Sequence, residues 1–176
     1  MFYLLRNGVW LAGLLLAPLA GRAQEMPTGW ALPVEVGQGF NHPPGADALY
    51  LATLQVVPQV TVVPERLRAG LVLGGFYPGT QVGGLAGGRL TCKLLEGKKF
   101  ALASTYHLNL QVEYLPVVQA GDGPRRQWVG AGLGLGTSNL LGVAIRLHRD
   151  FATPATYGQL SLAVNLLYKT HRNPDL

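Results

Sequence analysis

Strict alternation of polar and apolar residues is the feature that most limits what this chain can form. In the segment TYHLNLQVEYL, residues 105–115, the polar residues His107, Asn109, Gln111 and Glu113 alternate with leucine, valine and tyrosine. Successive side chains of a β-strand point to opposite faces, so this segment has one polar face and one apolar face. Similar alternation recurs along the chain, and no segment after residue 23 shows a clear helical period. The sequence therefore predicts an all-β fold.

Turn residues divide the alternating regions into eight predicted strands. Their ranges are 30–40, 49–63, 67–77, 82–96, 100–117, 127–136, 140–151 and 156–170. Most exceed the length of about nine residues that a tilted strand needs to cross a bilayer. Longer loops follow the first and fifth strands, and tight turns follow the second, fourth and sixth. These features predict an eight-stranded up-and-down antiparallel transmembrane β-barrel.

The N-terminal segment predicts export. A single charge, Arg6, precedes the apolar run VWLAGLLLAPLA, and GRA at 21–23 places small residues where a signal peptidase cleaves. This run is too short for a transmembrane helix. We therefore expect a signal peptide over residues 1–23 and one barrel domain over residues 24–176.

The amino-acid composition argues against several other classes of protein. Charged residues make up 13% of the chain, against about 25% in a typical soluble domain. The net charge of +5 falls to +3 without Arg6 and Arg22, which is too small to predict nucleic-acid binding. Cys92 is the only cysteine and cannot form an internal disulfide. The four histidines are scattered, so neither a metal site nor a cofactor is expected.

The apolar face is expected to point outward, toward lipid. The polar face carries Gly74, Gly130, Gly132, Gly134 and Gly142, which would weaken a water-facing sheet but would make room inside a narrow barrel. Aromatic residues lie toward strand ends on the apolar face, as in the aromatic girdles at membrane interfaces. The predicted interface aromatics are Tyr50, Tyr77, Phe100, Tyr114 and Tyr168.

Charged residues in the middle of strands support the same orientation. Arg89 and Arg146 would each cost about 2–4 kcal/mol if they faced lipid at the bilayer midplane. Facing inward, they can pair with other polar groups. The predicted polar network of the lumen comprises Glu35, Arg89, His107, Glu113, Arg146, His148 and Asp150.

Hairpin geometry gives specific pairings for this network. A three-residue turn at GKK, residues 97–99, would place Arg89 opposite His107. A turn centred on Ser138 would place Arg146 opposite Gly130 and His148 opposite Trp128. One interpretation is a plug that fills the lumen and fixes strand register. The other is a proton or ion path, or a pH gate that depends on the two histidines.

A resemblance to a known group of proteins rests on the count of eight strands and on three segments, LAGRA, TYHLNLQVEYL and QLSLAVNLLY. In architecture the chain resembles the small eight-stranded outer-membrane barrels of the OmpA, OmpX and OmpW type. The resemblance implies a location in the bacterial outer membrane and contact with lipid, lipopolysaccharide and the barrel-assembly machinery. Arg125 and Arg126, beside a loop, are candidates for contact with lipopolysaccharide phosphates.

The expected function is that of a monomeric barrel with a filled lumen and a structural or surface-interaction role. Three alternatives stay open: a narrow channel for small solutes, a soluble periplasmic carrier similar to lipocalins, and a lipid A acyl-modifying enzyme. We do not expect an enzyme, because Ser104 lies on the opposite face from His107 and Glu113. The glycines of GAGLGLG, residues 130–136, lack the spacing of a nucleotide-binding loop.

Overall fold

A computed structural model describes residues 29–42, 49–77, 82–100, 103–119, 126–137, 141–153 and 155–168. The strands are β1 Trp30–His42, β2 Leu49–Val56, β3 Gln59–Val63, β4 Leu67–Tyr77, β5 Gly83–Phe100, β6 Ala103–Gln119, β7 Arg126–Thr137, β8 Leu141–Asp150 and β9 Thr156–Tyr168. No helix long and apolar enough to cross a membrane occurs in these ranges. The expected signal peptide lies outside them.

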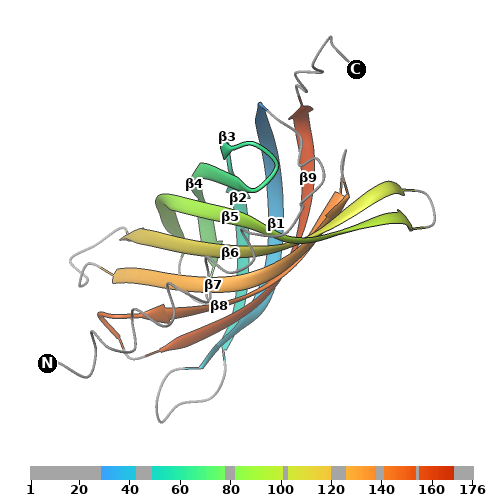
Figure 1. Ribbon diagram of the computed structural model, residues 1–176. Coiled ribbons are helices and arrows are strands. Elements are labelled where there is room, and N and C mark those ends of the chain that lie inside the picture. Colours follow the sequence, from blue (N-terminus) through green and yellow to red (C-terminus); the bar gives the residue numbers. More distant parts are fainter. Residues whose placement is uncertain are drawn as a thin grey trace, which may run out of the picture.

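The strands form a closed antiparallel up-and-down barrel (Figure 1). Closure comes from β1, which pairs with β9 through contacts such as Val34 opposite Val164. The barrel has eight wall positions, because β2 and β3 occupy one position between β1 and β4. Pro58 separates these two segments; it has no N–H to donate to the ladder. The wall stays hydrogen-bonded there, since Val57 donates to Pro33 and Leu71 donates to Pro58.

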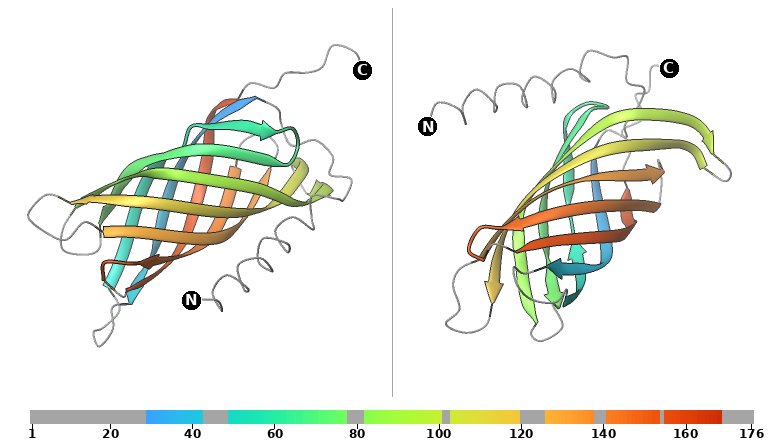
Figure 2. Two further views of the ribbon diagram at one scale, coloured as in Figure 1. Left: turned by 60° about the vertical axis from the view of Figure 1, so that its left-hand side comes forward. Right: turned by 90° about the horizontal axis from the view of Figure 1, so that it is seen from below.

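The two ends of the barrel differ in their connections. At the short-turn end lie the start of β1, the end of β9 and the connections 64–66, 101–102 and 138–140. At the long-loop end lie the connections 43–48, 78–82, 120–125 and 151–155. Figure 2 shows that the β5–β6 hairpin extends beyond its neighbours at the short-turn end.

The predicted hairpin registers were wrong. Residues 97–99 belong to β5, which pairs with β6 as far as Phe100 opposite Ala103, so Arg89 pairs with Glu113 and His107 pairs with Glu96. A bulge between Lys93 and Leu95 adds a further shift. Arg146 pairs with Gly132, and His148 pairs with Gly130 rather than Trp128. The β5–β6 error arises because the backbone ladder continues through the lysines that were assigned to a turn.

Polar side chains line the lumen in its middle and at the short-turn end, and apolar side chains cover the outside. Arg89 and Arg146 are each 2% exposed, whereas Ile145, the neighbour of Arg146, is 63% exposed. The alternation of the sequence therefore places the charges inside a closed cylinder.

Candidate functional site in the barrel lumen

Arg89 on β5 is the centre of an ion-pair cluster in the middle of the lumen. Its Nε donates to Glu113 Oε1 on β6 at 2.5 Å. Its two terminal nitrogens bind both carboxylate oxygens of Glu35 on β1, with 2.8 Å between Nη2 and Oε2. Nη2 also donates to Gln55 on β2. Because β1 and β5 are not neighbours in the sheet, this bidentate pair crosses the lumen.

Arg146 on β8 completes the cluster from another side of the barrel. Its Nη2 lies 2.8 Å from Glu35 Oε2, and its Nε lies 3.3 Å from Glu113 Oε1. Gln111 and Ser161 accept further hydrogen bonds from it. Two guanidinium groups thus face two carboxylates, and their formal charges cancel. His148 Nε2 lies 2.8 Å from the second oxygen of Glu113.

Glycines on β7 provide the space that these side chains occupy. A Cβ on Gly132 would lie 2.6 Å from Cγ of Arg146 and would also meet the carbonyl oxygen of Ile145. A Cβ on Gly130 would lie 2.8 Å from Cγ of the His148 ring. Both distances are shorter than real Cβ contacts. The glycine-rich segment of β7 therefore leaves room for the large side chains of β8 to extend across it into the lumen.

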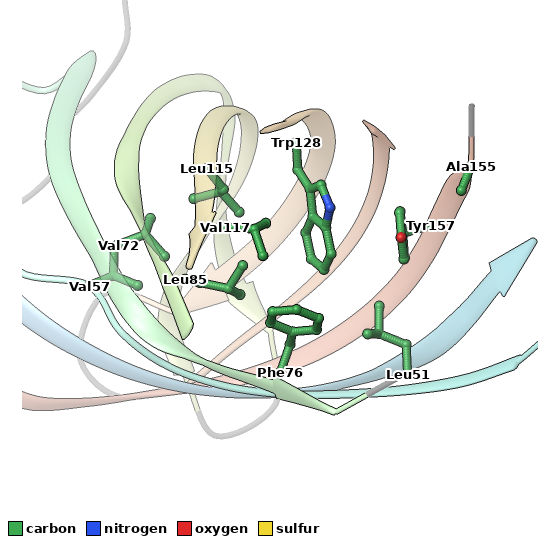
Figure 3. Packing of buried hydrophobic residues seen from close by; sticks show 10 residues of the cluster. All are labelled: Leu51, Val57, Val72, Phe76, Leu85, Leu115, Val117, Trp128, Ala155 and Tyr157. Carbon is green, nitrogen blue, oxygen red and sulfur yellow. The ribbon is translucent and has the colours of Figure 1, made fainter. Parts of the chain in front are cut away.

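An apolar cluster fills the lumen at the long-loop end (Figure 3). Trp128 on β7 is at its centre, stacked on Tyr157 at 4.4 Å between ring centroids and edge-on to Phe76 at 4.9 Å. Its members are Leu51, Val57, Val72, Phe76, Leu85, Leu115, Val117, Trp128, Ala155 and Tyr157. We call this set the apolar plug. It lies on the long-loop side of the ion pairs.

Asp150 and Arg126 lie beside the apolar plug. Arg126 Nε is 2.6 Å from Asp150 Oδ2, and its guanidinium lies 5.8 Å from the Trp128 ring centroid. Asp150 also accepts hydrogen bonds from the Ala152 N–H and the Thr153 hydroxyl. Asp150 therefore fixes the turn between β8 and β9 and takes no part in the central ion pairs. The Arg126 guanidinium also lies 5.6 Å from the Tyr157 ring centroid.

A polar cavity of about 100 Å³ lies at the short-turn end. His107, Arg68 and Thr91 line it, together with Asn109 and Asn165. His107 is 4% exposed, and neither ring nitrogen has a hydrogen-bond partner. The Thr91 hydroxyl and the side-chain oxygens of both asparagines are likewise buried without a hydrogen bond. We call this space the polar cavity.

The predicted network residues therefore lie in three places. Glu35, Arg89, Glu113, Arg146 and His148 meet in the central cluster. Asp150 lies at the long-loop end, as described above. His107 lines the polar cavity, where its Nδ1 is 3.8 Å from Glu96, a carboxylate already bound to Lys93 at 2.5 Å.

Three of the predicted interface aromatics have described side chains. Tyr50, Tyr77 and Tyr114 are 44%, 43% and 48% exposed on the outer surface. The side chains of Phe100 and Tyr168 lie outside the described part of the chain.

The apolar plug was missed from the sequence, although a signal for it existed. On β6 the inward-facing residues change from Gln111 and Glu113 to Leu115 and Val117 as the strand approaches the long-loop end. The cavity residues Arg68 and Thr91 were assigned to the polar face without a role. The convergence of these residues with His107 depends on strand pairing that alternation does not specify.

These features define a closed barrel with an apolar plug at one end of its lumen, an ion-pair cluster in the middle and a polar cavity at the other end. No protein-family model, curated protein or solved structure matches the chain. Within the described ranges, no group of three or more His, Cys, Asp or Glu side chains is placed to hold a metal ion.

Proposed function

We propose that the chain is an integral protein of a bacterial outer membrane whose filled lumen gives it a structural or surface-interaction role. The observation that carries this proposal is the apolar outer wall. Leu71, Leu90, Ile145 and Leu160 are each more than half exposed, and they come from four different strands. A soluble monomer rarely exposes a continuous apolar patch of more than a few hundred Å².

Strand length supports the same proposal. The strands other than the split pair β2 and β3 have 10 to 18 residues, against about 9–11 that a tilted membrane strand requires. The described interface tyrosines lie toward strand ends on the same surface as the leucines. A soluble carrier with an apolar pocket would have the opposite distribution, with its leucines and valines mainly inside.

The filled lumen favours a closed barrel over a channel. Arg89 and Arg146 connect β1, β5, β6 and β8 across the interior. The apolar plug fills the lumen at the long-loop end. An ion that passes these groups must lose its hydration shell, which costs free energy. The arginines and carboxylates would not offset that cost, because they already neutralise one another.

A charge on the outer wall tests the membrane location. Ile145→Arg, in the middle of β8, is expected to cost about 2–4 kcal/mol in a bilayer and to reduce the amount of barrel resistant to carbonate washing. Val63→Arg, at the end of β3, is the matched control, since charge near the interface costs about 0–1 kcal/mol. Heat-modifiable gel mobility reports folding of both variants. Equal behaviour of the two variants, or release of the unmodified protein by carbonate, would contradict the membrane proposal.

Planar-bilayer recording tests the closed lumen. The purified chain is expected to give no steady single-channel steps. Steady steps from the unmodified protein would contradict the closed lumen and favour the narrow-channel function.

A further inference from the structure

We propose that Arg149, on the outer wall at the long-loop end, binds the phosphate of a membrane lipid whose acyl chains lie on the apolar wall beside it. This inference rests on the proposed function, because it needs lipid around the barrel. Its test reads one side chain in detergent micelles, so failure there is distinguishable from release of the barrel by carbonate.

Arg149 differs from every other charged residue whose side chain the structure describes. It is exposed, whereas the others are buried or half-buried. Its Nη1 donates to the Thr156 hydroxyl at 2.8 Å, and no carboxylate in the described part of the chain pairs with it. An arginine stays protonated at any ordinary pH. This part of the outer wall therefore carries a positive charge that no acidic residue offsets.

Arg149 lies where the apolar surface of β8 ends. The outward residues before it on this strand are all exposed and apolar: Leu141, Val143, Ile145 and Leu147. Arg149 follows them, next to the last residue of the strand, at the long-loop end. Arginine is costly in the middle of the hydrocarbon and is tolerated near the interface. In a bilayer that covers the apolar part of β8, the guanidinium is therefore at the level of the lipid headgroups.

Polar neighbours add hydrogen-bond donors around this guanidinium. Val129 on β7 and Thr156 on β9 are directly opposite Arg149. Gln127, two residues from Val129, is also exposed on the outer face of β7, and such diagonal neighbours across strands lie about 7–8 Å apart. Guanidinium, hydroxyl and amide groups all donate to phosphate oxygens, and the planar guanidinium can bind two of them at once. Three adjacent strands thus supply donors to one place on the wall.

The apolar residues around Arg149 favour a lipid over a soluble phosphate. Leu147, Val129 and Phe151 are all exposed beside it. A cation next to large apolar side chains suits a molecule that carries acyl chains next to a phosphate, and basic residues near a bilayer surface attract anionic lipids. Arg126, a candidate for this contact from the sequence, is bound to the buried Asp150 instead.

Arginine side-chain NMR tests the site directly. The refolded chain, with ¹⁵N-labelled arginine in non-ionic maltoside micelles, is titrated with dihexanoyl phosphatidic acid. We expect a saturable shift of the Arg149 Nε–H signal, which the Arg149→Gln variant identifies by its loss. Dihexanoylglycerol, which has the same chains without the phosphate, should give no saturable shift. Sodium phosphate should bind about tenfold or more weakly, because it buries no acyl chain.

Substitutions on β8 separate a lipid from a free anion. Leu147→Gln removes an apolar contact beside Arg149 and should weaken phosphatidic acid binding severalfold, with sodium phosphate binding unchanged. Leu141→Gln, on the same face at the other end of β8, is the matched control and should bind as the unmodified chain does. If Leu147→Gln fails to fold, Thr156→Val replaces it and should weaken phosphatidic acid binding severalfold, because a hydroxyl donor is lost.

Four results would each overturn the proposal. They are the absence of a saturable Arg149 shift with phosphatidic acid, an equal shift with dihexanoylglycerol, and equal affinity for sodium phosphate. The fourth is equal phosphatidic acid affinity in the Leu147→Gln or substituting Thr156→Val variant and the Leu141→Gln control.

Discussion

The two ends of the lumen are filled in different ways. At the long-loop end, aromatic and aliphatic side chains pack together, with the Trp128 and Tyr157 rings stacked at 4.4 Å. At the short-turn end, polar side chains surround a cavity and several lack hydrogen bonds. The comparison teaches that the polarity of a barrel interior can change along a single strand. We infer that the apolar plug supplies more of the stability than the residues around the polar cavity do.

Strand β6 contributes to every part of this arrangement. Its inward residues are His107 in the polar cavity, Glu113 in the ion-pair cluster and Leu115 in the apolar plug. Substitutions on one strand can therefore compare the three regions in the same barrel.

The largest effect is expected at the boundary between the two ends. Glu113→Gln leaves Arg89 and Arg146 with Glu35 as their remaining carboxylate in the cluster. The free energy of unfolding should fall by about 3–5 kcal/mol, because a buried charge loses its partner. Urea unfolding followed by tryptophan fluorescence measures it. Glu65→Gln, in the turn between β3 and β4, should change stability by less than about 0.5 kcal/mol. Similar losses in the two variants would contradict a special role for the cluster.

A substitution in the apolar plug is expected to lower the free energy of unfolding by a similar or smaller amount. Leu115→Ala removes a side chain that is fully buried, and it should lower the free energy of unfolding by about 2–5 kcal/mol. Leu115→Met keeps most of the volume and should cost less than about 1.5 kcal/mol. Urea unfolding followed by tryptophan fluorescence measures both variants. Equal losses in the two would contradict close packing around Leu115.

An intermediate effect is expected where β7 makes room for β8. Gly132→Ala places a methyl group against Arg146 and the Ile145 carbonyl and should cost about 1–3 kcal/mol. Gly88→Ala on β5 is the control, since the nearest atom to its Cβ would be 3.9 Å away. A stable Gly132→Ala barrel would mean that the strands of the lumen adjust more easily than their close packing indicates.

The smallest effect is expected in the polar cavity. Thr91→Val replaces a hydroxyl that has no hydrogen bond with a methyl group of similar size. Stability measured by urea unfolding should stay within about 0.5 kcal/mol of the unmodified chain. A loss of more than about 1 kcal/mol would mean that the cavity residues hold the barrel together, against the inferred separation of roles.

Alternation was enough to predict the eight wall positions and the inward direction of the predicted network residues Glu35, Arg89, His107, Glu113, Arg146, His148 and Asp150. It could not predict register, because a shift by an even number of residues leaves every side chain on the same face. Arg89 illustrates this limit. Its predicted partner His107 and its observed partner Glu113 are six residues apart on the same face of β6. The split at Pro58 and the bulge near Lys93 are local backbone features that side-chain alternation does not encode.

Contacts across the lumen were beyond prediction for a related reason. Arg89 and Glu35 are on strands that do not pair, so their meeting depends on the closure and stagger of the whole barrel. The sequence indicated that Glu35, Arg89 and Arg146 face inward, but it did not indicate which of them touch.

Closure through β1 and β9 has a consequence for how quickly the protein folds. Val34 and Val164 are paired although 130 residues separate them in the chain. Pairing of such distant segments is slow, because the entropy of closing a long loop is lost before the contact forms. Until β9 arrives, β1 keeps an open edge that can pair with other chains. The seam between the first and last strands is therefore where assembly finishes and where aggregation competes with it.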